Sequence, residues 1–182
     1  MSNDRAQILV ERLAHVLRED LRAVATAHGL ALAQLEVLRY LALANRFSDT
    51  LSALVEYLGT TKGTVSQTVS ALERKGLIER LPDAEDGRIQ HCRLTEAAEG
   101  VVRASDGPEL LRRVVLDAST INRLEGVLRD LLKARDGRAF GVCVTCAHHR
   151  VTQQGRRCAL LGVDLTEHDA TRICREHMSE AA

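Results

Sequence analysis

The chain has 182 residues, of which 45% are hydrophobic and 2% aromatic, so its core must be built from Leu, Val and Ala rather than from rings. The 25 basic and 25 acidic side chains cancel, so any surface for a polyanion must come from the local placement of Arg and Lys. The first twenty residues are charged and lack the apolar stretch of a signal peptide, and no apolar run has the length of a membrane span. We therefore expect a cytoplasmic protein without membrane contact, in which thiols stay reduced.

The periodicity of the apolar residues predicts a mainly α chain with one small β-hairpin. The first helix should end at Gly29, because glycine suits the left-handed cap of a helix C-terminus. Ser48 or Asp49 can cap the third helix and Ser119 the sixth, and the residues 106–108 can interrupt the fifth. The expected helices cover residues 4–27, 31–44, the stretch up to 58, 62–75, the stretch from 95, and 119–135.

The helix at 62–75 is followed by Gly76 and by a hairpin, whose strands are expected at 77–81 and 88–94 around a polar tip. A short helix and a turn precede the helix at 62–75. This order of elements is that of a winged helix-turn-helix, a fold that binds DNA.

The helix at 62–75 has two different faces. Val65, Val69 and Leu72 share one face and should pack inward. The opposite face carries short polar groups that can approach base edges; Gln67 can pair with adenine, and Lys62 can meet a phosphate. Any amphipathic helix has a polar face, so the order of the elements is what favours DNA binding here. The candidate DNA contacts on this helix are Lys62, Gly63, Thr64, Gln67, Ser70 and Arg74.

Residues 30–100 resemble the MarR family of winged-helix transcription regulators, and the long flanking helices extend the likeness to about 5–135. The resemblance implies a homodimer bound to DNA. It adds Ser66 to the candidate DNA contacts, and also Arg88, whose counterpart in the family's acidic–basic wing pair enters the minor groove. The chain departs from the family at Gly87, where a second Arg is common, which would weaken or loosen the wing. The matching stretches are 64–67, 72–80, 83–88, 93–96 and Gly100.

The helix at 119–135 independently favours a dimer. Ile121, Leu124, Leu128 and Leu131 repeat with the three–four spacing of a helix-packing seam. Packing within one chain would give the same spacing. A two-fold dimer would place two recognition helices about 34 Å apart, so we expect a near-palindromic operator in double-stranded DNA.

Four of the five cysteines lie in the last 40 residues, as Cys143-x₂-Cys146-x₁₁-Cys158-x₁₅-Cys174, with His177 close behind. Thiolates with this spacing favour a metal centre over a disulfide in a reducing compartment. The four cysteines would hold an iron–sulfur cluster, [4Fe–4S] or [2Fe–2S]. Alternatively Cys143, Cys146, Cys174 and His177 would bind Zn²⁺ and leave Cys158 unused. The cluster is the preferred interpretation, because it uses every tail cysteine.

These observations predict a homodimeric DNA-binding regulator whose operator affinity changes with an iron–sulfur cluster that senses redox state or iron. The first alternative is a regulator with a structural zinc tail that answers to a small phenolic ligand. A thiol oxidoreductase using Cys143 and Cys146 ranks lowest, because no cofactor motif accompanies them, so we expect no enzyme and no catalytic residue. Cys92 should be a small buried side chain. The expected divisions are a dimerisation helix at 1–29, a winged helix at 30–100, dimerisation helices at 101–136 and the cysteine-rich tail at 137–182.

Overall fold

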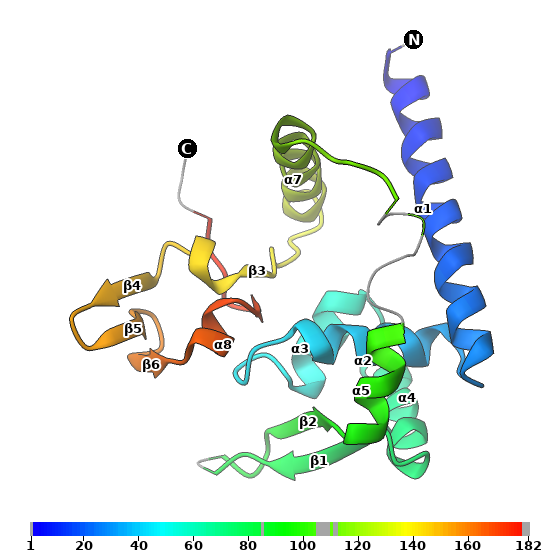
Figure 1. Ribbon diagram of the computed structural model, residues 1–182. Coiled ribbons are helices and arrows are strands. Elements are labelled where there is room, and N and C mark those ends of the chain that lie inside the picture. Colours follow the sequence, from blue (N-terminus) through cyan, green and yellow to red (C-terminus); the bar gives the residue numbers. More distant parts are fainter. Residues whose placement is uncertain (1, 85, 105–109, 111–112, 180–182) are drawn as a thin grey trace.

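The computed structural model describes residues 2–84, 86–104, 110 and 113–179 (Figure 1). The predicted interruption at 106–108 lies outside these residues. The described chain is mainly helical with a small β wing, as the sequence predicts. Among its described helices, none combines the length and the apolarity needed to cross a membrane.

The winged helix is built from five helices and one hairpin. Strands β1 and β2 are antiparallel, with Ile78 opposite Leu94 and Pro82 opposite Gln90. The left-handed backbone of Gly29 follows the first helix, as predicted, with φ of 63°. The elements are α1 (Ser2–Ala27), α2 (Leu32–Leu43), α3 (Leu51–Leu58), α4 (Lys62–Arg74), β1 (Ile78–Pro82), β2 (Gln90–Leu94) and α5 (Glu96–Ala104).

The core lies where α2, α3 and α4 meet the hairpin. Val65, Val69 and Leu72 of α4 are all buried, so the predicted inward face of this helix is confirmed. Cys92 of β2 is buried among them, also as predicted. Each such side chain contributes about 1.5–3 kcal/mol by leaving water. This packing fixes which face of α4 remains for solvent.

Two predicted helix caps are wrong. Thr50, rather than Ser48 or Asp49, caps α3, and its hydroxyl accepts the N–H three residues on. Ser48 and Asp49 are both buried and bond to other parts of the chain. Asp117, rather than Ser119, caps α7, where a carboxylate also suits the positive end of the helix.

The tail forms a small lobe of short strands beside α3 (Figure 1). Strand β3 pairs with β7, and β4, β5 and β6 form an antiparallel sheet. The tail's sequence had predicted cysteine ligands but not these strands. The elements, with the helix that leads to them, are α7 (Ala118–Lys133), β3 (Gly141–Val142), the 3₁₀ turn η1 (Cys143–Thr145), β4 (His149–Thr152), β5 (Gly155–Cys158), β6 (Val163–Leu165), α8 (Glu167–Ala170) and β7 (Ile173–Cys174).

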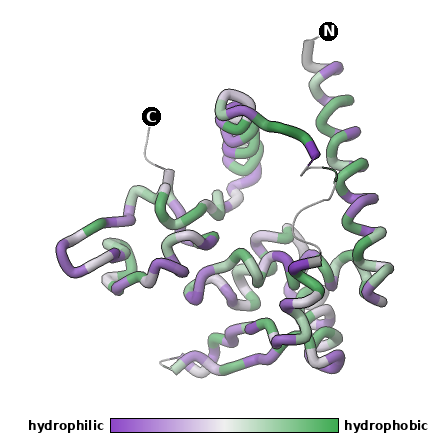
Figure 2. Tube along the Cα trace, in the orientation of Figure 1, coloured by the Kyte–Doolittle hydropathy of each residue, from purple (hydrophilic) through white to green (hydrophobic). Residues whose placement is uncertain are grey.

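Helices α1 and α7 extend away from the core (Figure 1), and both carry apolar residues along their length (Figure 2). In α1, Leu21 and Val24 pack on the core, whereas Leu9 and Leu13 are more than half exposed. No residue of α7 within its described range is buried. The exposed apolar residues of α7 are Ile121, Leu124, Val127, Leu128 and Leu131.

Candidate nucleic-acid interface and cysteine centre

The outward face of α4 carries the predicted DNA contacts. Its N-cap, Thr61, holds the first turn through its hydroxyl, which accepts the N–H of Thr64 at 3.2 Å. The exposed residues on this face are Lys62, Gly63, Thr64, Gln67 and Arg74, whereas Ser66 and Ser70 are half-buried. The exposed polar residues of this face therefore lie on the first two turns of the helix and at Arg74 in its last turn.

Ser70 is not directed only towards solvent. The Arg80 guanidinium of β1 donates to its hydroxyl at 3.3 Å and to the Glu73 carboxylate at 3.0 Å. The hydrogen bond from Arg80 lowers the pKa of Glu73. This ion pair anchors the wing to the C-terminal half of α4, a role for Arg80 that the sequence alone had not indicated.

The wing tip carries Arg88, whose side chain is 93% exposed. The Asp86 carboxylate accepts hydrogen bonds from the backbone N–H of Arg88 at 3.0 Å and from its Nε at 3.1 Å. The acidic–basic pair that the sequence suggested is therefore formed, and it lies exposed at the wing tip.

Behind the tip, His91 ties the wing to the segment that joins α2 and α3. Its Nδ1 lies against the Asp49 carboxylate, and its Nε2 lies 3.0 Å from the Asp83 carboxylate. Burial alone would lower the pKa of His91. Its hydrogen bonds with the two carboxylates raise this pKa by a larger amount, so the net shift is upward. The backbone carbonyl of Asp49 also accepts the N–H of Cys92 at 2.7 Å. No local sequence signal predicts this tie, because Asp49 and His91 are 42 residues apart.

We expect this tie to make the stability of the winged helix depend on pH. A histidine whose folded pKa is raised contributes fully below its unfolded pKa of about 6.5, and the contribution is lost as pH rises through the folded pKa. Urea unfolding from about pH 5.5 to 8.5 should therefore show stability falling, and His91→Gln should remove that slope. The control is His15→Gln, since His15 is exposed on α1. The same slope in His91→Gln would contradict this assignment.

The four tail cysteines gather in one region. Cys143 and Cys146 flank η1, Cys158 ends β5 and Cys174 ends β7; the first, second and fourth are buried, and none forms a disulfide. Burial raises the pKa of Cys143 to about 11, and the charges of the other three cysteines add to the rise. Cys158, which is partly buried, packs against the cluster formed by Cys143, Leu165 and Cys174. Within the described residues, however, no three His, Cys, Asp or Glu side chains are placed closely enough to hold a metal ion.

Backbone amides point at the cysteine sulfurs. The Cys146 sulfur accepts the N–H of His148 at 3.5 Å and that of Met178 at 3.4 Å, and the Cys158 sulfur accepts the N–H of Leu161 at 3.5 Å. A neutral thiol is a weak acceptor, whereas donors aimed at sulfur stabilise the thiolate that a metal requires. These donors favour the thiolate forms of Cys146 and Cys158.

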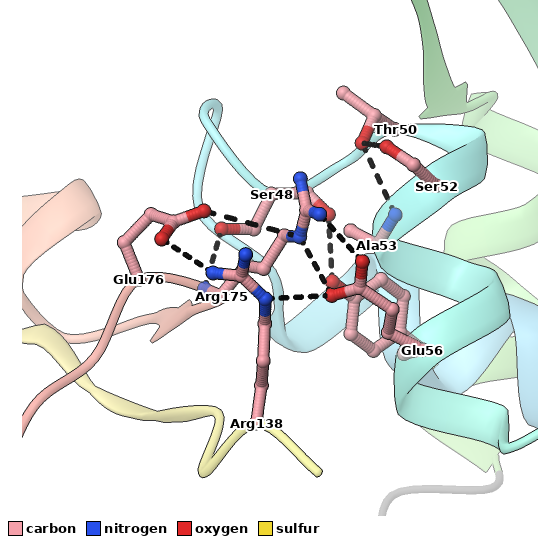
Figure 3. Close-up of polar contacts among 9 residues, drawn as sticks. Ser48, Thr50, Ser52, Ala53, Glu56, Arg138, Arg175 and Glu176 are labelled. Carbon is pink, nitrogen blue, oxygen red and sulfur yellow. Dashed lines mark hydrogen bonds and ion pairs between the residues drawn. The ribbon is translucent and has the colours of Figure 1, made fainter. Parts of the chain in front are cut away.

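Strand β7, which ends at Cys174, is bonded to the segment before α3, where the N–H of Asn45 donates to the Ile173 carbonyl at 2.9 Å. Burial raises the pKa of Cys174. The Ser48 hydroxyl also accepts the N–H of Arg175 at 2.9 Å (Figure 3). The last tail cysteine is therefore embedded in the junction between the two parts of the chain.

Ion pairs hold the tail on α3. Arg175 donates through Nε to the Glu56 carboxylate at 2.8 Å and makes a second bond to it through Nη2 (Figure 3). Arg138 bridges the same carboxylate, at 3.1 Å, and that of Glu176. The hydrogen bond from Arg175 lowers the pKa of Glu56. Two arginines thus fix the lobe to the first helix of the helix-turn-helix.

Three histidines of the tail, His148, His149 and His177, each have a buried ring nitrogen without a hydrogen-bond partner among the described residues. The Nε2 of His177 lies 3.0 Å from the Thr145 hydroxyl, and burial lowers the pKa of His177. Its Nδ1 and the Nε2 atoms of His148 and His149 are buried without a hydrogen-bond partner among the described residues. His177 therefore lies in the predicted region, but one of its nitrogens is already engaged by the protein.

The His177 ring packs against the backbone of Gly141, where a Cβ atom would lie 2.5 Å from three ring atoms. We expect Gly141→Ala to loosen the tail by about 1–3 kcal/mol, since a crowded site must shift. Labelling of the buried thiols in metal-free protein should then accelerate by about 10-fold or more, because labelling follows local opening. Gly126→Ala is the matched control, since nothing lies within 4 Å of that position. Equal labelling rates in both variants would refute the predicted clash.

Comparison with known proteins identifies the winged helix. The model of the MarR family matches residues 28–89. The structure of S. aureus MepR in its DNA-binding conformation is 24% identical, with a TM-score of 0.64 over 71% of this chain and 98% of that chain. The transcriptional regulator PA3341 is 26% identical (TM-score 0.57; 71% and 97% covered). FabT of Streptococcus pneumoniae in complex with DNA is 19% identical (TM-score 0.56; 75% and 98% covered). A comparison with curated proteins gives no match.

Proposed function

We propose that the protein is a homodimeric transcription regulator that binds double-stranded DNA, and that its tail holds a cysteine-ligated iron–sulfur cluster whose presence changes operator affinity. The DNA-binding part is supported by the MarR-family winged helix at 28–89 and by its likeness to MepR and FabT, which have been seen with DNA or in a DNA-binding conformation. The observation that carries the sensing part is that β7, which ends at Cys174, is attached to the segment before α3: the N–H of Asn45 donates to the Ile173 carbonyl, and the N–H of Arg175 donates to the Ser48 hydroxyl.

The proposed DNA surface combines α4 with the wing. Gln67 and Thr64 on the exposed face of α4 have the hydrogen-bonding groups for base edges, and Lys62 lies at the helix start where a phosphate would be met. Arg88 extends from the wing tip into solvent, which suits entry into a minor groove. The chain has no net charge, but DNA binding requires only that basic side chains such as Lys62 and Arg88 lie on the DNA surface.

The proposed dimer would use the apolar faces of α1 and α7. Both helices extend from the core, and their apolar side chains are about half exposed. A contiguous exposed apolar face of this kind marks a protein–protein interface. A second copy of the chain would bury it and place two α4 helices on one near-palindromic operator.

The proposed cluster would be ligated by Cys143, Cys146, Cys158 and Cys174. The four-thiolate set is favoured over the zinc set because Cys158 packs against Cys143 and Cys174 and would be left unused by zinc. Backbone donors to the sulfurs and the buried position of three of the thiols would stabilise such a cluster. Zn²⁺ held by Cys143, Cys146, Cys174 and His177 is the alternative.

Metal analysis and an absorption spectrum of protein purified without air test this proposal. A brown sample with sulfur-to-iron charge-transfer bands supports the cluster. A colourless sample that contains one zinc per chain overturns the cluster in favour of a structural zinc tail. A sample without metal overturns both.

One observation favours a second candidate, a regulator that answers to an anionic small molecule. A cavity of about 850 Å³ lies between α2, β2, α5 and the tail. Phenolic acids carry a negative charge that the arginines lining this cavity would attract. Thermal unfolding with and without salicylate tests the candidate, because a bound ligand raises the unfolding midpoint. An unchanged midpoint would count against it. The arginines that line the cavity are Arg39, Arg46, Arg93, Arg103 and Arg172.

A further inference from the structure

We propose that the ring of His91 positions the wing-tip residue Arg88 for DNA, and that operator affinity therefore falls as pH rises. The proposal rests on the proposed DNA-binding function, with Arg88 as the wing contact, and it is independent of the metal centre. Its basis is a continuous series of hydrogen bonds that runs from the buried segment before α3, through the His91 ring, to the tip of the hairpin.

The inner end of this series is fixed in the winged helix. The Nδ1 of His91 lies against the Asp49 carboxylate, and both side chains are largely buried. Thr50 forms a β-bridge with His91, and the Asp49 carbonyl accepts the N–H of Cys92 at 2.7 Å. These contacts hold the ring at one place on β2, so its second nitrogen faces the wing tip from a fixed position.

The outer end of the series reaches the arginine. The Nε2 of His91 lies 3.0 Å from the Oδ2 of Asp83, whose Oδ1 accepts the N–H of Asp86 at 2.8 Å. The Asp86 Oδ1 in turn accepts the N–H and the Nε–H of Arg88. The hairpin extends away from α4 (Figure 1), and the Arg88 side chain is exposed. The direction of this arginine therefore depends on the bonds that shape the tip, and the bond between His91 and Asp83 ties the tip to the rest of the winged helix.

The two forms of the His91 ring hold the tip differently. An imidazolium has two N–H donors and can donate to both carboxylates, whereas a neutral ring donates from one nitrogen only and turns a lone pair towards the other carboxylate. The Asp49 side chain is 12% exposed and that of Asp83 is 30% exposed. Asp49 has less water to replace a lost bond, so the neutral ring keeps Asp49 and releases Asp83. Deprotonation of His91 therefore frees the wing tip.

The charged groups around His91 set the direction of the pH effect. Among the described residues, Asp49 from the segment before α3 and Asp83 from the wing face the ring, and Arg93 of β2 acts on Asp49. Burial alone would lower the pKa of His91, but the two carboxylates raise it by more. The imidazolium is therefore present below the ordinary histidine pKa of about 6.5 and is lost as pH rises through the higher folded value. Operator affinity should be highest at the acid end of this range.

Fluorescence anisotropy of the full chain with an operator duplex selected from a random pool, at one salt concentration and from about pH 6 to 9, tests the proposal. The unmodified protein should bind about 10-fold less tightly at the alkaline end, because a well-placed arginine contact is worth about that much. His91→Gln should lose this pH dependence, and His15→Gln, which changes an exposed histidine of α1, is the control that should keep it.

Arg88→Ala separates positioning from simple attraction between a charged His91 and DNA. This variant keeps His91, so a mere charge effect would persist in it. Under the proposal it should bind more weakly than the unmodified protein at the acid end, and its affinity should change by less than about 2-fold across the range.

The outcomes separate this proposal from the proposed function. A protein that binds the duplex equally well at both ends of the pH range overturns the proposal alone. A full pH dependence that survives in Arg88→Ala also overturns it. A chain that does not bind DNA at any pH overturns the proposal together with the DNA-binding function. If His91→Gln does not fold, Asp83→Asn is compared in its place; a smaller pH dependence is expected, and an unchanged one overturns the proposal.

Discussion

Replacing Leu124 and Leu128 of α7 by glutamate is expected to convert the proposed dimer to a monomer and to lower operator affinity by about 10³-fold. Both side chains are about half exposed in the single chain, so the substitutions leave its core intact. In a dimer the same positions would be buried, and unpaired carboxylates there are costly. A monomer also loses the second recognition helix, whose tethering raises affinity by about 10²–10⁴.

Sedimentation of the unmodified protein and of the Leu124→Glu, Leu128→Glu variant measures the oligomeric state of each. Fluorescence anisotropy with an operator duplex, selected from a random pool, measures the DNA affinity of each. The control is the pair Arg123→Glu and Arg129→Glu, which changes exposed residues of the same helix outside its apolar stripe. A dimer that persists in the Leu124→Glu, Leu128→Glu variant would show that α7 is not the interface.

The second large effect is expected at Cys158. Cys158→Ser should abolish the absorption bands of the centre, because the four-thiolate set loses one of its ligands. His177→Gln should leave those bands in place, since the four-thiolate set does not include His177. The spectra and the iron and zinc contents of both variants, prepared without air, give the result.

The paired design discriminates between the two ligand sets. Under the zinc set the outcome is reversed, with metal lost from His177→Gln and retained in Cys158→Ser. Cys92→Ala is the control for cysteine loss in general, because Cys92 is buried in the wing and lies apart from the tail cysteines in the chain.

The winged helix could be predicted from sequence because its signals are local. The inward face of α4 follows from the spacing of Val65, Val69 and Leu72, and the hairpin follows from two short apolar stretches around a polar tip. The helix caps were less certain, since several Ser, Thr and Asp residues precede each helix. Burial decided between them: Ser48 and Asp49 serve long-range contacts, which left the cap of α3 to Thr50.

The tail could be predicted only as a set of ligand types. The spacing of the cysteines indicates a metal centre, but the strands that carry them are two to four residues long and leave little periodicity to detect. Their attachment to the winged helix links residues far apart in the chain, such as Glu56 with Arg175, 119 positions apart. The pairing of Asp49 with His91 has the same origin. Contacts of this kind become visible only in three dimensions.

The central claim is that loading of the tail changes DNA binding, and the affinity of one operator duplex for loaded and metal-free protein tests it most directly. The duplex would come from selection on a random pool, and both forms would be titrated without air at one salt concentration, since salt alone shifts such affinities. A ligand that shifts a regulator between two states typically changes affinity by about 5-fold or more, which is the difference we predict. Equal affinities would contradict the sensing function and leave a DNA-binding protein with a structural tail.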